Sequence, residues 1–127
     1  MSEKIAFIGL GAMGGPMASN IIKKGTKVSV FDINSERMKK VTEVGGTGCK
    51  NINETVSNAE IVITMLPATQ QVNEVMLGQN GLVSQLKPGS IIMDMSTISP
   101  KGTDEVKKEC DKHEIHFVDA PVGRLVS

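Results

Sequence analysis

The sequence has almost no aromatic residues: three phenylalanines, and neither tryptophan nor tyrosine. A hydrophobic core must therefore consist of Ile, Val, Leu and Met. The eight methionines suit this aliphatic role better than metal binding, because they form no close cluster. Long hydrophobic runs are also missing, and none approaches the roughly 20 apolar residues that a membrane-spanning helix needs. We expect no membrane segment.

The chain also lacks an excess of charge of either sign. Fourteen Lys and Arg residues balance fourteen Asp and Glu residues, so the formal net charge is zero. Nothing favours nucleic acid or an anionic membrane surface as a partner, because both require a basic face. With 127 residues and no linker, low-complexity tract or internal repeat, the chain fits one domain that spans residues 1–127.

Cysteine is scarce, and export signals are missing. Cys49 and Cys110 lie far apart without the spacing of a metal or redox site, which is typical of buried thiols in a reducing compartment. The few residues before the first apolar run are mixed in charge, unlike a signal peptide. The expected location is the cytoplasm.

Motifs for several other chemistries do not occur. The sequence has no G-x-x-x-x-G-K-[ST] phosphate loop and no serine nucleophile motif. His113 and His116 precede and enter a predicted strand, where they would face opposite ways, and no third ligand is near. We expect no metal site.

What the sequence does contain is an alternation of short apolar runs with helical patterns. Runs rich in Ile and Val are typical of strands buried on both faces; five occur, at residues 5–10, 28–32, 61–66, 91–95 and 116–122. Helical patterns fall between them, at residues 14–24, 34–41, 70–76, 82–86 and 99–110. Around Gly48 we expect a short strand, and after Asn53 one helical turn. Because strands that alternate with helices pair in parallel, the expected fold is α/β, a Rossmann-type doubly wound parallel sheet in a single domain.

The first apolar run ends in a glycine-rich turn. Residues 9–14 read G-x-G-x-x-G between a predicted strand and a predicted helix, which is the context that a dinucleotide-binding turn requires. The first glycine permits the tight turn, the second lets a pyrophosphate approach the backbone, and the third lets helix and strand pack closely. The pyrophosphate would meet unpaired N–H groups at the positive end of the helix. The alternative is a plain glycine-rich turn. The candidate cofactor-binding residues here are Gly9, Leu10, Gly11, Ala12, Met13 and Gly14.

An acidic residue follows at a suitable distance. The second predicted strand ends in Asp32, 18 residues after Gly14, against an expected spacing of about 20. A carboxylate there accepts both hydroxyls of the adenine ribose and repels a 2′-phosphate, so NAD(H) is preferred over NADP(H). An arginine directly after it would weaken this preference, but Ile33 and Asn34 follow. The alternative is that Asp32 caps the next helix, although Asn34 and Ser35 suit that role.

Three other predicted strands end in polar or turn-forming segments. These read TMLPATQQ, DMSTISP and VDAPVGR. In an open parallel sheet, ligands bind outside the carboxyl ends of the strands. All three segments are therefore candidate parts of a site, although each could also be an ordinary strand–helix loop.

Several segments together resemble the β-hydroxyacid dehydrogenase family. They are FIGLGAMGGPMASN, the FD that ends the second strand, TMLP, DMSTISP and VDAPV, and they follow in the family's order across residues 5–122. The resemblance implies an NAD(P)-dependent oxidoreductase that interconverts a short 3-hydroxy acid and its aldehyde, so the partner is a small anionic aldehyde or hydroxy acid. It also implies that Leu66, Pro67 and Gln71 lie beside the cofactor and that Thr97 lies near the nicotinamide ribose.

The last matching segment departs from the family pattern. The family usually reads D-A-P-V-S-G-G, where the serine and glycines contact the substrate's acid group, whereas Gly123 and Arg124 follow the DAPV of this chain. PVGR resembles the 3-sulfolactaldehyde reductase branch, which implies that Gly123 and Arg124 bind substrate. A guanidinium is a planar, permanently charged fork suited to a sulfonate or carboxylate. The alternative is that Arg124 is a surface residue, and sulfolactaldehyde, methylmalonate semialdehyde and tartronate semialdehyde all remain open as substrates.

The family's catalytic lysine has no counterpart here. In the family it lies on a helix of a second, all-helical domain and protonates the developing alkoxide as a general acid. We therefore expect no catalytic residue within residues 1–127 and place the lysine beyond Ser127. The chain is expected to be the N-terminal cofactor domain of a longer protein that forms a homodimer or homotetramer. A non-catalytic NAD-binding module is the alternative from a different class.

Overall fold

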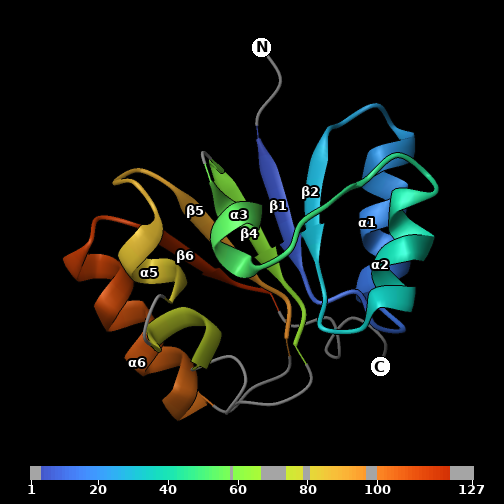
Figure 1. Cartoon of the computed structure of the whole chain (residues 1–127). Helices are drawn as coiled ribbons and strands as arrows, with labels where there is room; N and C mark the ends of the chain where they lie inside the picture. The colour runs from blue at the N-terminus through green and yellow to red at the C-terminus, as the bar shows by residue number, and fades with distance from the viewer. Residues whose placement is uncertain (1–3, 58, 67–73, 79–80, 97–99, 121–127) are drawn as a thin grey trace.

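The computed structural model describes residues 4–57, 59–66, 74–78, 81–96 and 100–120 of the chain, and for residues 100–103 it describes the main chain only. Its centre is a six-stranded parallel sheet with the order β3-β2-β1-β4-β5-β6 (Figure 1). The strands are β1 (Ile5–Ile8), β2 (Val28–Phe31), β3 (Thr47–Gly48), β4 (Ile61–Thr64), β5 (Ile91–Asp94) and β6 (His116–Asp119). The expected Rossmann-type α/β fold is confirmed.

Helices connect the strands. They are α1 (Gly14–Lys23), α2 (Ser35–Thr42), α3 (Ile52–Val56), α5 (Leu82–Gln85) and α6 (Pro100–Lys112), and residues 74–77 are helical as well. Side chains set the start of two of them: Asn34 accepts hydrogen bonds from the second and third N–H groups of α2, and Asn51 accepts one from the third N–H group of α3. Gly25 follows α1 with a φ of +99°, a left-handed conformation that suits glycine and ends the helix.

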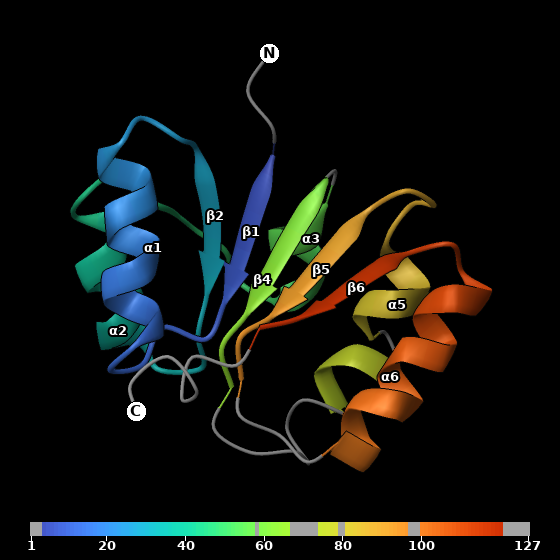
Figure 2. The ribbon, with the colours of Figure 1, turned by 180° about the vertical axis from the view of Figure 1, so that it is seen from behind.

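The sheet divides the core into two clusters. On one face, α1 and α2 pack Ala18, Ile22 and Val41 against the sheet. On the other face lie α3, residues 74–77, α5 and α6, which is why α3 stands in front of the sheet in Figure 1 and behind it in Figure 2. Strand β1 serves both clusters, because Phe7 points to the first and Ala6 and Ile8 to the second.

The chain changes direction across the sheet next to β1. It runs outward from β1 to β2 and β3, and then crosses back so that β4 pairs with the other side of β1. Ligands in open α/β sheets bind outside the carboxyl ends of the strands at such a switch point. The site is therefore expected where β1 and β4 end.

Most predicted elements agree with the structure, and the differences lie at their ends. The strands stop one or more residues earlier than predicted, because Gly9, Asp32 and Met65 already belong to the loops that follow. The helical turn predicted after Asn53 was placed too late, since the Asn51 cap starts α3 at Ile52. Helix α6 runs to Lys112 rather than to residue 110. The predicted cap Ser99 lies outside the described residues.

Both cysteines are free and buried, as the sequence predicted. Burial, and secondarily the nearby charges of Asp111 and Glu109, raise the pKa of Cys110 to about 11, so its thiol is unreactive near neutral pH. Among the described residues, no group of three His, Cys, Asp or Glu side chains is arranged to hold a metal ion. None of the helices in the described part of the chain combines the length and apolar character needed to cross a bilayer.

Candidate cofactor site

A cavity of about 540 Å³ lies at the carboxyl ends of β1, β2 and β4. The glycine turn after β1, the end of β2, the start of α2 and the loop after β4 line it, together with residues 74 and 75. This is the switch point of the sheet, so the fold itself places the cavity where a ligand is expected.

The fold of the protein requires a glycine at position 9, the first glycine of the turn. Gly9 has a φ of +98°, which side-chain-bearing residues rarely adopt. A Cβ at this position would also overlap the carbonyl oxygen of Met65. The backbone is held there because the N–H of Gly9 donates to the carbonyl of Phe31 at 3.0 Å and the N–H of Met65 donates to the carbonyl of Ile8 at 2.9 Å. The turn after β1 thus packs directly on the loop after β4.

The other two glycines of the motif differ in how much room a Cβ would have. A Cβ on Gly14, the first residue of α1, would overlap the carbonyl oxygen of Gly9, so this glycine allows helix and strand to pack closely. A Cβ on Gly11 would only reach ordinary contact with the guanidinium of Arg37, 3.6 Å from its Nη1. The described protein leaves room at Gly11, which fits a turn whose second glycine is kept open for a ligand.

Helix α1 begins without a side-chain cap. Met13 occupies the N-cap position and makes no capping hydrogen bond, and the first turn contains no acidic residue. By contrast, Asn34 and Asn51 cap α2 and α3. Gly14, the first residue of α1, lies beside the cavity, whereas the N–H of Gly15 donates to the carbonyl of Gly11 at 2.9 Å and Pro16 has no N–H. The positive end of the helix, with the N–H of Gly14, suits an anion such as a phosphate.

Asp32 joins the second strand to the glycine turn. Its Oδ2 accepts a hydrogen bond from the N–H of Leu10 at 2.7 Å, and its Oδ1 accepts one from the N–H of Asn34 at 2.8 Å. The cap of α2 is Asn34, whose side chain accepts from Glu36 and Arg37, so the helix does not need Asp32 for that role. A carboxylate has about four acceptor positions, so both oxygens can accept further hydrogen bonds, and Asp32 lines the cavity.

Arg37 also lines the cavity, and sequence reasoning missed it. The residues directly after Asp32, Ile33 and Asn34, are uncharged, whereas the Asn34 cap turns the chain so that the third helical residue, Arg37, faces the glycine turn. The signal that could have found it is this cap, because it fixes which residues stand in the first turn of α2. The cavity therefore combines an uncapped helix end with an exposed guanidinium.

The remaining predicted residues fall into two groups. Leu66 lines the cavity, as do Ala12 and Met13, whereas the side chain of Leu10 is buried in the core and its N–H is bound to Asp32. The other predicted positions lie outside the described residues, and their roles stay predictions: Pro67, Gln71, Thr97, Gly123 and Arg124.

A buried polar cluster stands behind Leu66. Asp94, the last residue of β5, is fully buried, and its Oδ1 accepts hydrogen bonds from the hydroxyl of Thr64 at 2.9 Å and from the N–H of Ser96 at 3.0 Å. The Ser96 hydroxyl in turn accepts from the N–H of Leu66 at 2.6 Å. Burial raises the pKa of Asp94, the hydrogen bonds from Ser96 and Thr64 oppose this, and the neighbouring Asp119 adds to it.

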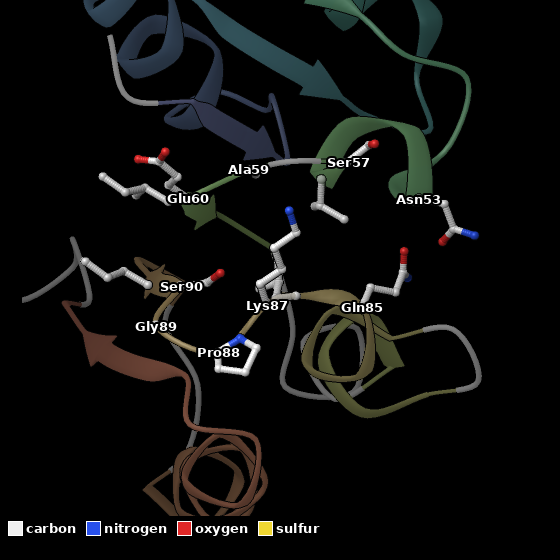
Figure 3. Close-up of a pocket in the computed structure, with 13 residues that line it drawn as sticks. Asn53, Ser57, Ala59, Glu60, Gln85, Lys87, Pro88, Gly89 and Ser90 are labelled. Atoms are coloured by element: carbon white, nitrogen blue, oxygen red, sulfur yellow. The ribbon is translucent and has the colours of Figure 1, made fainter. Parts of the chain in front are cut away.

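A second cavity, of about 670 Å³, opens between α3 and α5 at the opposite end of the strands. It lies at the amino ends of β4 and β5, with Lys87 in the middle of its lining and Glu60 pointing away from it (Figure 3). Lys87 is exposed. Although larger, this cavity is far from the carboxyl ends of the strands, where such sheets bind ligands.

The glycine turn at the switch point and the acidic residue that follows β2 define a dinucleotide-binding domain of the Rossmann class. A family model described as the NAD binding domain of 6-phosphogluconate dehydrogenase matches residues 4–124. The chain belongs to this family.

Relatives narrow the comparison to hydroxyacid dehydrogenases. The chain is 41% identical over 120 residues to 3-sulfolactaldehyde reductase of Escherichia coli K12, covering 94% of this chain and 40% of the relative. It is 39% identical over 119 residues to 3-hydroxyisobutyrate dehydrogenase of Pseudomonas aeruginosa, with 94% and 40% coverage. The structure of 3-hydroxyisobutyrate dehydrogenase from Mycobacterium tuberculosis with L-serine superposes with a TM-score of 0.88 at 32% identity, covering 95% of this chain and 40% of that one.

These comparisons confirm the resemblance to the β-hydroxyacid dehydrogenase family that the sequence motifs indicated. The chain spans about 40% of the length of the curated relatives it matches. Its match is to the cofactor-binding part of the family, since the family model that covers it describes an NAD-binding domain.

Proposed function

We propose that this chain is the NAD(H)-binding part of an oxidoreductase that interconverts a small anionic 3-hydroxy acid and its aldehyde. The observation that carries the proposal is the glycine turn: the protein leaves Gly11 open and the start of α1 uncapped, beside a carboxylate at the end of β2. The names of the relatives, a reductase and dehydrogenases of small hydroxy acids, give the reaction class.

The residues of the cavity divide the work of holding the cofactor. The positive end of α1, with the N–H of Gly14, would bind the pyrophosphate, and the guanidinium of Arg37 would add positive charge beside Gly11. The free acceptor positions of Asp32 would take hydrogen bonds from the adenine ribose. Leu66 would give an apolar wall against the cofactor. The nicotinamide supplies hydride transfer, and the protein orients it.

Asp32 favours NAD(H) over NADP(H) in this proposal. A carboxylate bound to the ribose hydroxyls repels a phosphate on the 2′ position. A guanidinium in contact with the 2′-phosphate would favour NADP(H). The guanidinium of Arg37, however, lies beside Gly11, at the pyrophosphate end of the turn. We therefore assign Arg37 to the pyrophosphate and the cofactor preference to Asp32.

Proton transfer belongs to the rest of the proposed protein. The expected general acid is a lysine of a second, helical domain beyond Ser127, and the assembled protein would be a homodimer or homotetramer. Gly123 and Arg124 would bind the substrate's acid group, and the PVGR segment favours sulfolactaldehyde. Methylmalonate semialdehyde and tartronate semialdehyde are the alternatives.

NADH fluorescence tests the cofactor proposal directly. We expect saturable binding of NADH by the full-length gene product, and loss of most of that affinity in Gly11→Val, whose fold should be kept since the described protein leaves room there. Absence of binding in the unmodified protein would sink the proposal.

Turnover separates the enzyme from the non-catalytic module. The full-length gene product should oxidise NADH when given one of the three aldehydes, and Arg124→Ser should mainly affect the sulfonated one. Tight NADH binding without turnover on any of the three aldehydes would favour the module.

A further inference from the structure

The loops after β4 and β5 are joined by a hydrogen-bonded chain that runs through the interior. Thr64 ends β4 and Asp94 ends β5, and the two residues are partners in the register of the parallel pair. The Asp94 carboxyl binds Thr64 and the N–H of Ser96 through one oxygen, and the Ser96 hydroxyl accepts from the N–H of Leu66. Thr64, Asp94 and Ser96 are 1% exposed or less.

This series of hydrogen bonds ends at Leu66, in the wall of the candidate cofactor site. Leu66 lines the cavity, and the residue before it, Met65, presents the carbonyl against which Gly9 packs. The loop after β4 is thus held on one side by the glycine turn and on the other by Ser96. A shift of this loop would alter the cavity without breaking the sheet.

We propose that Asp94 is a positioning residue of the cofactor site: through its Oδ1 it orients Ser96, and Ser96 fixes the Leu66 wall of the cavity. The proposal rests on the proposed function for the identity of the ligand, NADH. It gives Asp94 no contact with the cofactor.

The choice of a carboxyl at this position is hard to explain by stability. Within the described part of the chain, Oδ2 of Asp94 is buried without any hydrogen-bond partner, and such a group costs free energy that an apolar side chain would avoid. The raised pKa of Asp94 reflects the same burial. Only Oδ1 is used by the fold, and this predicts that an asparagine, which keeps an acceptor oxygen, can replace Asp94.

The test compares four single variants of the full-length gene product and the double variant Asp94→Ala/Ser96→Ala. Asp94→Ala and Ser96→Ala each remove a link, Asp94→Asn keeps the acceptor, and Val106→Ala weakens the same core cluster from α6 without touching the chain of hydrogen bonds. We expect the first two to raise the Kd for NADH about fivefold, the change of one lost hydrogen bond. The double variant should be no weaker than the weaker single one, because the two residues act in series.

Two control variants distinguish a positioning role of Asp94 from an effect of its charge and from a general loss of stability. Asp94→Asn should stay within about twofold of the unmodified protein, while Val106→Ala should lower Tm as much as Ser96→Ala and leave the Kd unchanged. An Asp94→Asn variant as weak as Asp94→Ala would overturn the proposal, since the charge or Oδ2 itself would then matter. A Kd that follows Tm across all variants, Val106→Ala included, would overturn it as well.

Amide exchange at Leu66 separates this inference from the proposed function. The exchange rate reports the Ser96 hydrogen bond with no cofactor present, and it should rise in Asp94→Ala and Ser96→Ala but not in Asp94→Asn. If the unmodified protein bound no NADH, the proposed function would fail, and the exchange rates would still decide whether Asp94 holds the loop.

Discussion

The carboxylate of Asp32 accepts a hydrogen bond from the backbone N–H of Leu10 at 2.7 Å, across 22 positions of sequence. The bond ties the end of β2 to the middle of the glycine turn after β1. The same carboxylate binds the N–H of Asn34, so one side chain fixes two of the segments that line the cavity. Its remaining acceptor positions are thus held in a defined orientation before a cofactor arrives.

Replacing Asp32 with asparagine should change the preference between cofactors. The substitution removes the negative charge but keeps an acceptor, so NADH should bind about tenfold more weakly. The affinity for NADPH should fall by less or should rise. Titrations of both cofactors with the variant measure the ratio, and Asp104→Asn, an exposed residue of α6, is the matched control. An unchanged ratio of the two Kd values would contradict the role assigned to Asp32.

Gly9 and Gly25 separate backbone strain from steric overlap. The two glycines have nearly equal φ angles, +98° and +99°, but a Cβ on Gly25 meets nothing within 4 Å, whereas one on Gly9 meets the carbonyl of Met65. Gly25→Ala should lower the free energy of unfolding by about 1–2 kcal/mol through conformation alone. Gly9→Ala should cost at least about 2 kcal/mol more. Denaturant unfolding measures both, and equal losses would show that the overlap is relieved.

Arg37→Gln should weaken NADH and NADPH to the same extent. The guanidinium lies beside Gly11, where the part common to both cofactors is expected, and it is exposed, so a loss of about two- to fivefold is reasonable. Thermal stability should not change, and Lys40→Gln on the same helix should bind like the unmodified protein. A loss confined to NADPH would instead assign Arg37 to the 2′-phosphate.

Asp94 gives the protein a predictable pH dependence of stability. Its pKa is raised by burial, with Asp119 on β6 contributing a further increase, so the folded state binds this proton more tightly than the unfolded state. The resulting stability is fully present below the ordinary pKa of 3.8 and is lost as pH rises through the folded pKa. The unmodified protein should therefore gain stability relative to Asp94→Asn as pH is lowered from 7 toward 4. Urea unfolding of both proteins across this range checks the sign, and a constant difference would contradict it.

The sequence predicted the fold because its signals are local. Apolar runs, the Asn34 cap and the glycine turn each depend on neighbouring residues, and together they fix the alternation of strands and helices. The ends of the strands were less predictable, because Met65 reads as part of an apolar run although its backbone already turns toward Gly9.

The parts of the site that were missed depend on contacts between distant residues. Asp94 and Thr64 are 30 positions apart and meet only through the register of β4 and β5. In the sequence, the aspartate is one polar residue at the end of an apolar run, and nothing nearby indicates that it is buried. Arg37 was missed for a related reason, since its place beside Gly11 comes from the packing of α2 against the turn.

Strand β1 contributes neighbouring residues to both core clusters, Phe7 to one and Ala6 and Ile8 to the other, and it pairs on both edges. Neither layer of helices can come away while the other keeps its packing intact, because each layer's loss exposes one side of the same strand. The two layers should therefore unfold as one cooperative unit, with the amides of β1 exchanging only when the whole domain opens.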